Sequence, residues 1–395
     1  PGGVGVGGGI PDYYWGCAGG LQDELDARTR EVGPLFTGPD AWKRSFHPDA
    51  RRVVVEQLLS DAGVRALYGA TLYGVERSGS RVRAGWVATD AGPVRLEAGA
   101  WVDATGDGDL CAQARVPFRL GRCGDGNLHA FSQSCGCFGM DKGRLAAWVS
   151  NFDRGFVDPT DSEDMTRARL AGVHGFAAPV VNAVNRLAYI APLIGLRQGR
   201  LIETDYLLTL DDLVDRRRFD DRVGYTGGHY DNHADDYEFE SLDALFLVWC
   251  AGLWGGRTAC EIPYRMLLPK GLSNVWIACR AAGLTEEAAH SFRMQRDLLR
   301  VGEVCGLAAA LALKRGTHNR AAPYAELRER LDRSGALALP PASSASFRQG
   351  ITAADFALPK IKTDASALRG AAFGPALWQL YRAGPKAADA DLRAL

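Results

Sequence analysis

The sequence predicts an α/β fold with an inserted α+β section and a helical C-terminal extension. Two segments carry this prediction. The first is a short apolar strand at residues 100–104 that runs directly into a Gly-rich turn and a helix beginning at Asp109. The second is the apolar run VWIAC from Val275, which is followed by a loop and a long helix of small residues, Met294–Lys314. A strand that leads through a tight turn into a helix is the building unit of α/β proteins.

Further elements are expected upstream of these two segments. Residues 48–62 show the apolar spacing of a helix, with Pro48 suited to its start and Gly63 to its stop. Polar turns at 78–80 and 90–92 separate a set of apolar runs, which predicts a small antiparallel sheet. The strands of this sheet are expected at residues 64–75, 82–89 and 94–96.

The composition excludes several classes of partner. With 395 residues, 47% of them hydrophobic, the chain can bury a large core. Its formal net charge of −1 provides no basic field for nucleic acid or an anionic membrane. Nine cysteines cannot all pair internally, which predicts reduced thiols and a cytoplasmic protein. Cys135 and Cys137 form a C-x-C pair without a second ligand cluster, so no metal site is predicted there.

The Gly-rich start of the chain contains a pattern that we discount. Gly3, Gly5 and Gly8 satisfy G-x-G-x-x-G. That motif binds a phosphate only between a strand and a helix, and Pro11 followed by aromatic residues does not open a helix. We therefore expect residues 1–20 to form a flexible loop without a regular element.

The turn after the strand at 100–104 is a stronger candidate for a ligand site. Gly106 and Gly108 allow the backbone to approach a ligand closely, and the helix N-terminus at Asp109 favours an anion. A tight turn with an Asp cap explains the same residues without a ligand. The turn by itself leaves both interpretations open.

A second segment turns this pattern into a family resemblance. Residues 262–313 contain a strand ending in Cys279-Arg280, an R-x-Q run at Arg293–Gln295, and a helix of G-E-x-x-G-x-A-A-A type. Together with ATGDGDL at 104–110, this resembles the FAD-dependent oxidoreductases with a glutathione-reductase-type Rossmann fold. The resemblance covers about residues 1–315, including the hairpin strands before the ATG strand.

The resemblance implies FAD as the cofactor and a set of residues that contact it. They lie at the start of the small sheet, in the ATGDG turn, at the end of the second strand and in the following helix. These residues are Thr71, Leu72, Ala104, Thr105, Gly106, Asp107, Gly108, Cys279, Arg280, Arg293, Met294, Gln295 and Gly302.

The helix after Arg293 has a physical reason to lie beside a flavin. Gly302, Gly306 and the alanines 308–310 leave one face almost free of side chains, which predicts close packing on the sheet and the cofactor. The helix N-terminus would direct its positive end at the flavin pyrimidine ring and raise the reduction potential. Cys279 stands where the family has glycine, and we interpret it as a packed small residue rather than a redox thiol.

The ADP half of FAD in that fold lies on an opening strand–G-x-G-x-x-G–helix unit. Residues 2–27 resemble the loop that follows this unit, so the resemblance implies that the first βαβ unit is missing and that the chain is N-terminally truncated. Any targeting segment would lie in the missing part.

Candidates for chemistry lie mostly in the middle of the chain. Arg197 and Arg200, in IGLRQGRLIETDY, are candidates for contact with an anionic substrate or flavin, with surface ion pairs as the alternative. His229 and His233 lie beside acidic residues, and they are better candidates for proton transfer than for metal binding. His290 lies three residues before Arg293 and is the other acid–base candidate. The neighbouring acidic residues are Asp231, Asp235 and Asp236, and the residues expected to line the same cleft are Tyr264 and Arg265.

These observations predict an enzyme that carries out two-electron transfer between FAD and a small organic substrate. The alternative is a flavin- or nucleotide-binding module without catalysis, which acts as an interaction protein through its helical C-terminal part. The predicted domains are a first FAD-binding part, an inserted substrate domain, a second FAD-binding part and a helical region. Their bounds are 1–117, 118–261, 262–316 and 317–395.

Overall fold

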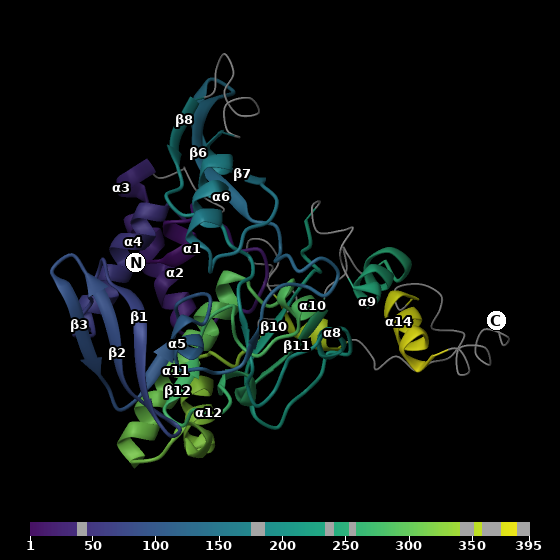
Figure 1. Cartoon of the computed structure of the whole chain (residues 1–395). Coiled ribbons are helices and arrows are strands. Elements are labelled where there is room, and N and C mark those ends of the chain that lie inside the picture. The colour runs from purple at the N-terminus through teal and green to yellow at the C-terminus, as the bar shows by residue number, and fades with distance from the viewer. Residues whose placement is uncertain are drawn as a thin grey trace.

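The computed structural model describes most of the chain, and Figure 1 shows how its elements are arranged. An antiparallel sheet flanks the N-terminal helices on one side, a second sheet projects from the body, and the last helix lies at the far end (Figure 1). The described residues are 1–37, 46–174, 186–233, 241–252, 258–339, 351–357 and 373–384.

A parallel pair of strands lies at the centre of the fold. Strand β4 (Trp101–Asp103) pairs with β12 (Val275–Ile277), with Trp101 opposite Val275. Helix α5 (Asp109–Gln113) follows β4, and helix α11 (Gln295–Arg315) follows β12 after a loop. Both predicted strand–turn–helix segments are thereby confirmed, and their bounds differ from the expected ones by a few residues.

A three-stranded antiparallel sheet precedes β4. It has the order β1-β2-β3, and helix α4 (Pro48–Asp61) leads into it, as predicted. The expectation of a strand from residue 64 was wrong, because residues 64–70 lie outside the sheet and are exposed. Their apolar side chains find no partner strand among the described residues. The strands are β1 (Thr71–Ser78), β2 (Arg81–Thr89) and β3 (Gly92–Glu97).

The N-terminal segment is more regular than expected. A four-residue helix, α1 (Gly3–Val6), forms where the sequence predicted a flexible loop. Gly5 packs against the first turn of α11, where an added Cβ would lie 2.6 Å from Oε1 of Gln295. The prediction was wrong because this tertiary contact holds a glycine run that has little helical preference of its own. Two helices follow, α2 (Leu21–Val32) and α3 (Pro34–Thr37).

The middle of the chain forms a second antiparallel sheet and two small strand pairs. The sheet has the order β7-β6-β8, and Figure 1 shows it projecting from the body with helix α6 beside it. The two pairs are β5 with β9 and β10 with β11. The elements of the sheet are β6 (Ser132–Asp141), β7 (Arg144–Asp153), α6 (Ser162–His174) and β8 (Arg186–Ile190). The paired strands are β5 (Phe118–Arg119), β9 (Leu201–Ile202), β10 (Arg222–Gly228) and β11 (Thr258–Pro263).

Short helices connect these sheets, and further helices follow in the described part of the C-terminal region, which the sequence predicted to be mainly helical. Helix α14 packs on the small helical group around residue 246 (Figure 1). The connecting helices are α8 (Leu210–Val214), α9 (Leu242–Leu245), the π-helix η2 (Phe246–Cys250), the 3₁₀-helix η3 (Tyr264–Leu267), α10 (Glu286–Ala289) and the 3₁₀-helix η4 (Asn319–Ala321). The later helices are α12 (Tyr324–Arg333), α13 (Ala353–Ala357) and α14 (Phe373–Ala383).

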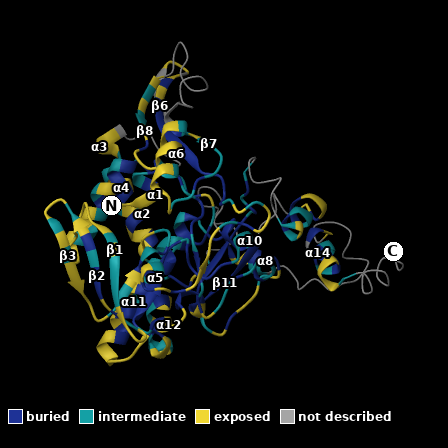
Figure 2. Cartoon of the chain, viewed as in Figure 1, coloured by how far each residue is buried: buried dark blue, intermediate teal, exposed yellow. Residues whose placement is uncertain are grey.

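The main hydrophobic core surrounds β12 and the buried side of α11 (Figure 2). Side chains from β2, β11 and α12 join it, so residues from each of the four predicted domain ranges share this core. All nine cysteines are free thiols, and seven of them are buried. Within the described residues, the structure has no helix that is both long and apolar enough to span a bilayer.

One face of α11 is open rather than packed. A Cβ added at Gly302 or Gly306 would meet no described atom within 4 Å. The prediction that these glycines pack closely on the sheet was therefore wrong among the described residues, whereas Ala308 and Ala309 are buried. The difference arises because the helix turns its Gly302–Gly306 stripe away from the β4–β12 pair and its Ala308 side toward the core.

Candidate functional site

The carboxyl ends of β4 and β12 bring two predicted segments together. Because the strands are parallel, the ATGDG turn after β4 and the Cys279–Arg280 end of the β12 segment lie at the same edge. The Arg280 guanidinium donates to Oδ1 of Asp107 at 2.7 Å. Burial raises the pKa of the Asp107 carboxyl above its ordinary value, and Arg280 offsets part of that rise. The two segments therefore form one polar site, the strand-end site.

Asp103 holds the ATGDG turn in shape, and the sequence prediction missed it. Its Oδ1 accepts from the Thr105 hydroxyl at 2.8 Å, and its Oδ2 accepts from the Cys111 backbone N–H at 2.9 Å. The Thr105 hydroxyl in turn accepts from the Asp109 N–H at 2.8 Å. Asp103 is fully buried. An acidic residue ending a buried strand was the available signal, since a buried carboxylate needs several donors.

Arg200 connects the middle of the chain to this turn. Its guanidinium donates to Oδ1 of Asp109 at 2.7 Å and to the Asp107 carbonyl at 3.2 Å. The preceding Gly199 lies so close that an added Cβ would overlap Oδ1 of Asp107. The segment at residues 199–200 therefore forms a third side of the strand-end site.

The Cys279 side chain is packed, as the sequence interpretation held. The residue is buried, and burial raises the pKa of its thiol to about 12. A thiol with such a pKa is almost entirely protonated near neutrality, and the thiol form is a poor nucleophile. Cys279 therefore occupies the place of the family glycine as a small core residue.

The N-terminus of α11 is fastened to the Gly-rich start of the chain. The Gln295 amide donates to the carbonyls of Ile10 and Asp12 at 2.8 and 3.0 Å. Further along the helix, Arg300 donates to the Gly19 carbonyl at 2.8 Å. Met294 is the N-cap residue of the helix. The loop over residues 9–20 is thus held against the helix end that the resemblance assigns to the flavin.

A buried carboxyl in the first turn of α11 was also missed. Asp297 is 1% exposed, its Oδ2 accepts from the Thr226 hydroxyl at 2.9 Å, and its Oδ1 has no hydrogen-bond partner within the part of the chain that the structure describes. Burial raises the pKa of Asp297 to about 8. The sequence offered no signal, because an acidic residue in a first helical turn is ordinary.

A second site, the histidine cluster, lies around Asp231. The Asp231 carboxylate accepts from Arg293 at 2.6 Å and lies 2.9 Å from Nε2 of His229. Its other neighbour, Nε2 of His233, is 3.7 Å away. Burial opposes its ionisation, but Arg293 and the two histidines hold the pKa of Asp231 well below its usual range.

His233 lies between two carboxylates. Its Nδ1 is 2.6 Å from Oδ2 of Asp153, and Asp153 also accepts from Arg197 at 2.7 Å. Burial opposes a charged imidazole, but the hydrogen bond to Asp153 and the nearby Asp231 carboxylate raise the pKa of His233 above its ordinary value. Arg197 is buried and also donates to the Ala130 carbonyl, so it is not a surface ion pair. Asp153 was missed because it ends β7, far from the histidines in sequence.

His290 enters the same cluster from the loop before α11. Its ring stacks on that of His129, with centroids 3.6 Å apart, and lies 4.5 Å from the Tyr230 ring. Both histidines are almost completely buried. His129 was missed, because a single histidine in an irregular segment gives no signal of a partner more than a hundred residues away.

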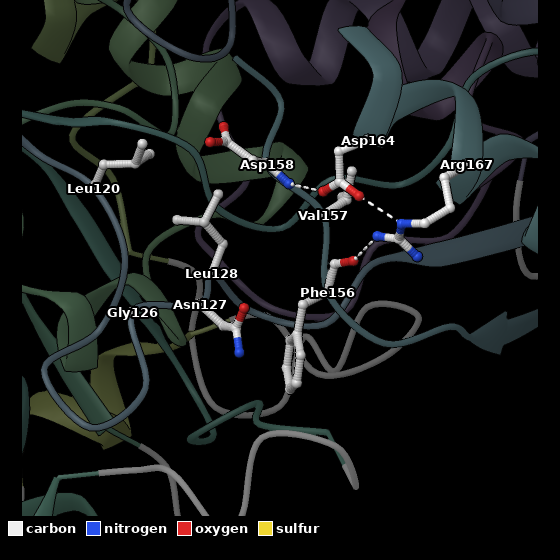
Figure 3. A pocket seen from close by; sticks show the side chains of 9 residues that line it. All are labelled: Leu120, Gly126, Asn127, Leu128, Phe156, Val157, Asp158, Asp164 and Arg167. Carbon is white, nitrogen blue, oxygen red and sulfur yellow. Dashed lines mark hydrogen bonds and ion pairs between the residues drawn. The ribbon is translucent and has the colours of Figure 1, made fainter. Parts of the chain in front are cut away.

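A surface pocket of about 470 Å³ opens beside the segment that carries His129 (Figure 3). Leu128, Val157 and the Phe156 ring form its apolar side. Asp164 accepts from the Asp158 N–H and pairs with Arg167 on its polar side. This mixture suits a small, partly polar ligand.

The structure thus brings most of the predicted site residues into two neighbouring groups. The strand-end site contains the predicted residues Ala104, Thr105, Gly106, Asp107, Gly108, Cys279, Arg280 and Arg200. The histidine cluster contains the predicted residues His229, His233, His290, Arg197 and Arg293, and Asp231. Thr71 and Leu72 lie apart from both on β1, and Gly302 lies on the open face of α11.

Several predictions about flanking residues fail or fall outside the description. Tyr264 lies in the main core, where its hydroxyl donates to the Asn319 carbonyl, and Arg265 pairs with Asp221 on the surface. Neither lines a cleft as expected, because η3 directs one inward and the other outward. Asp235 and Asp236 lie outside the described residues. Among the described residues, no group of three or more His, Cys, Asp or Glu side chains could hold a metal ion.

Comparison with known proteins decides the family. The model of a family described as FAD dependent oxidoreductase matches residues 2–177 and 142–331. The chain belongs to this family. FAD is accordingly its cofactor.

Other comparisons add little. A search of the curated proteins finds no match to this chain. Among solved structures, the chain is similar to the OxyS anhydrotetracycline hydroxylase from Streptomyces rimosus, with 14% identity and a TM-score of 0.28. That similarity covers 50% of this chain and 47% of the hydroxylase, so the chain spans about half the length of that relative.

The strand-end site and the start of α11 fit the flavin half of FAD. Gly106 has a φ of 93°, which only glycine adopts without strain, and it exposes backbone at the turn. Nε of Arg280 is buried, and none of the described residues forms a hydrogen bond with it. The first turn of α11 adds N–H groups and the positive end of a helix dipole. The described residues therefore offer donors and an open turn, as an anionic reduced flavin requires.

Proposed function

We propose that this chain is the catalytic part of an FAD-dependent oxidoreductase that transfers two electrons to or from a small organic substrate. One observation carries the proposal: residues 197–200 join the two groups of residues. Arg200 bonds to the ATGDG turn, and Arg197 bonds to Asp153 in the histidine cluster. A cofactor site and an acid–base cluster that share one short segment have the arrangement that a redox reaction coupled to proton transfer needs.

FAD, when bound, supplies the two-electron chemistry. The ATGDG turn and Arg280 would hold the cofactor at the strand ends, and the N-terminus of α11 would lie against the flavin. The chain's own contribution is to bind, to orient and to move protons. Asp103 fixes the turn, and Gln295 keeps the loop at residues 10–12 on the helix end.

The histidine cluster would manage the proton. His233, held between Asp153 and Asp231, is a charged donor whose ring orientation is fixed by the 2.6 Å contact with Asp153. Arg197 and Arg293 balance the two carboxylates, so protonated His233 leaves this group with an excess positive charge. That charge favours a substrate that is anionic or becomes so during the reaction.

We further propose that β4 receives another parallel strand, from a βαβ unit that carries the ADP half of FAD. Among the described residues β4 pairs with β12 alone, and Val102 is 37% exposed in this central strand. Leu67 and Tyr68 are more than half exposed nearby in the chain, and the Gly302–Gly306 face of α11 is open. Parallel sheets are normally covered on both faces, and a strand plus a helix would cover these surfaces together.

An FAD titration of the purified chain tests this proposal. We expect weak binding by the chain alone, and binding at least ten-fold tighter after fusion to an N-terminal strand–G-x-G-x-x-G–helix unit, measured by quenching of flavin fluorescence. The matched control carries the same fused unit on a chain with Gly306→Leu, which would block the open face of α11. Equal affinity with and without the unit would contradict the missing-strand proposal.

The redox function is tested with the FAD-loaded protein. A panel of alcohols, sugars and unsaturated compounds should include one that bleaches the yellow flavin, and air should restore the colour. A loaded protein that stays yellow with the whole panel would support the alternative, a flavin-binding module without catalysis. His233→Gln should slow bleaching more than it weakens FAD binding.

A further inference from the structure

The stacked rings of His129 and His290 are a feature that the proposed function does not yet use. Their centroids lie 3.6 Å apart with planes inclined by 19°, and their exposures are 3% and 1%. Two imidazolium ions at this distance would repel each other strongly in a buried site. The stack therefore limits the pair to one positive charge, that is, to one proton added to the two neutral rings.

The hydrogen bonds of the pair distinguish its two members. Nδ1 of His290 lies 3.3 Å from the Asp231 carbonyl oxygen, which can only accept, so this nitrogen carries a hydrogen. Nδ1 of His129 is buried and has no hydrogen-bond partner among the described residues. A buried polar atom without a partner is rare in a folded protein, and a ligand or a proton-transfer role explains it.

The charges that face His129 favour its neutral form. Burial lowers the pKa of His129 well below its ordinary value, and the neighbouring His290, Arg293, Arg122 and Arg197 lower it further. Each of the three arginines is paired with its own carboxylate, so these carboxylates are not available to stabilise a charged His129. The pairs are Arg293 with Asp231, Arg122 with Asp125, and Arg197 with Asp153.

Resting on the proposed function, we propose that the stacked His129 and His290 form a pair that accepts only one added proton and is the base of the site, with Nδ1 of His129 contacting a hydroxyl or amine donor of the substrate. In the step, the donor O–H or N–H bond breaks and its electron pair stays on the substrate atom. A new N–H bond forms at Nδ1 of His129. Both rings are neutral before the step; after it, the added proton is on Nδ1 of His129 and the His290 ring stays neutral.

Histidine-selective ¹⁵N NMR of the whole chain tests the pair, because seven histidines give a resolvable spectrum. The His129 signals, assigned by loss in His129→Gln, should not titrate between pH 8 and pH 6. In His290→Gln the titration midpoint of His129 should move upward, since a competing proton site is gone. The exposed His318 provides the control, and His318→Gln should leave the His129 signals unchanged.

A matched pair of small probes tests the contact. 2-Propanol can donate a hydrogen bond to Nδ1, whereas acetone of similar size can only accept, so the alcohol alone should shift the Nδ1 resonance. The proposal is overturned if His129 titrates in the wild type, if its midpoint does not move in His290→Gln, or if both probes act equally. These measurements need no flavin. If FAD does not bind, or if no substrate bleaches the flavin, the proposed function fails, but the histidine pair can still be tested by NMR.

Discussion

The two parts of the candidate site differ in how their residues are distributed along the chain. The strand-end site draws mainly on two continuous segments, 103–109 and 279–280, which a parallel strand pair places together. The histidine cluster draws on five segments, around residues 129, 153, 197, 229–233 and 290–293. A site formed where strands end is encoded locally, whereas a site formed by loops that converge depends on the whole fold.

The largest effect is expected from Gly106→Val in the strand-end site. At a φ of 93° a β-branched side chain is strained, by about 1–3 kcal/mol. An added Cβ would also lie 3.0 Å from Nη1 of Arg280 and disturb the Arg280–Asp107 pair. We expect loss of FAD from the loaded protein, measured as the flavin-to-protein absorbance ratio.

Gly79→Val separates the two causes. Gly79 also has a positive φ, 58°, but an added Cβ there meets no atom within 4 Å. This variant should lose stability through backbone strain and keep its FAD. If both variants retain flavin equally well, the ATGDG turn is only a connection between strand and helix.

How much the sequence could predict follows from the same contrast. The turn at 104–108, the helix from Pro48 and the long α11 were all predictable, because local propensity and glycine position decide them. Residues 64–70 were mispredicted, because a strand needs a neighbour and an apolar run does not show whether one exists. The α1 helix was missed for the opposite reason, since Gln295 stabilises a run that propensity disfavours.

The histidine cluster shows what pattern reasoning leaves out. His229, His233 and His290 could be nominated from the neighbouring acidic and arginine residues. Asp153 and His129 could not, because only the packing of β7 and of the segment after residue 126 brings them to their partners. Asp153 helps to raise the pKa of the nominated His233, and His129 stacks on the nominated His290.

A smaller effect is expected from Asp231→Asn in the histidine cluster. The change removes the carboxylate that Arg293 contacts at 2.6 Å, and the Arg293 side chain is only 10% exposed. Removing one partner of a buried ion pair typically costs about 3–5 kcal/mol, and partial exposure of Asp231, together with the remaining bond from Arg293 to the Asp231 carbonyl, places the expected loss near the lower end. Urea unfolding at pH 7 measures this loss of stability.

Glu329→Gln is the control for this prediction. Its ion pair has partners that are both 67% exposed, so the change should give no measurable loss of stability. Equal midpoints for the two variants would show that the cluster is solvated and not a buried network.

The smallest effect, and the one that tests the contrast itself, belongs to Asp297. This residue lies within the predicted flavin segment, yet nothing in the sequence marked it as a buried acid. Its pKa is about 8 in the folded chain and near 4 when unfolded, so the folded state binds more protons across that window. Stability should therefore fall as pH rises from about 4 to about 8 and then level off.

The variant Asp297→Asn tests this dependence, because it keeps the contact with Thr226 and cannot ionise. Its free energy of unfolding should rise relative to that of the wild type by about 1 kcal/mol between pH 6 and pH 7. A constant difference between the two unfolding curves from pH 5 to pH 8 would mean that Asp297 is ionised in the folded chain. The start of α11 would then hold a fixed negative charge, which would oppose the anionic flavin that the helix end is proposed to stabilise.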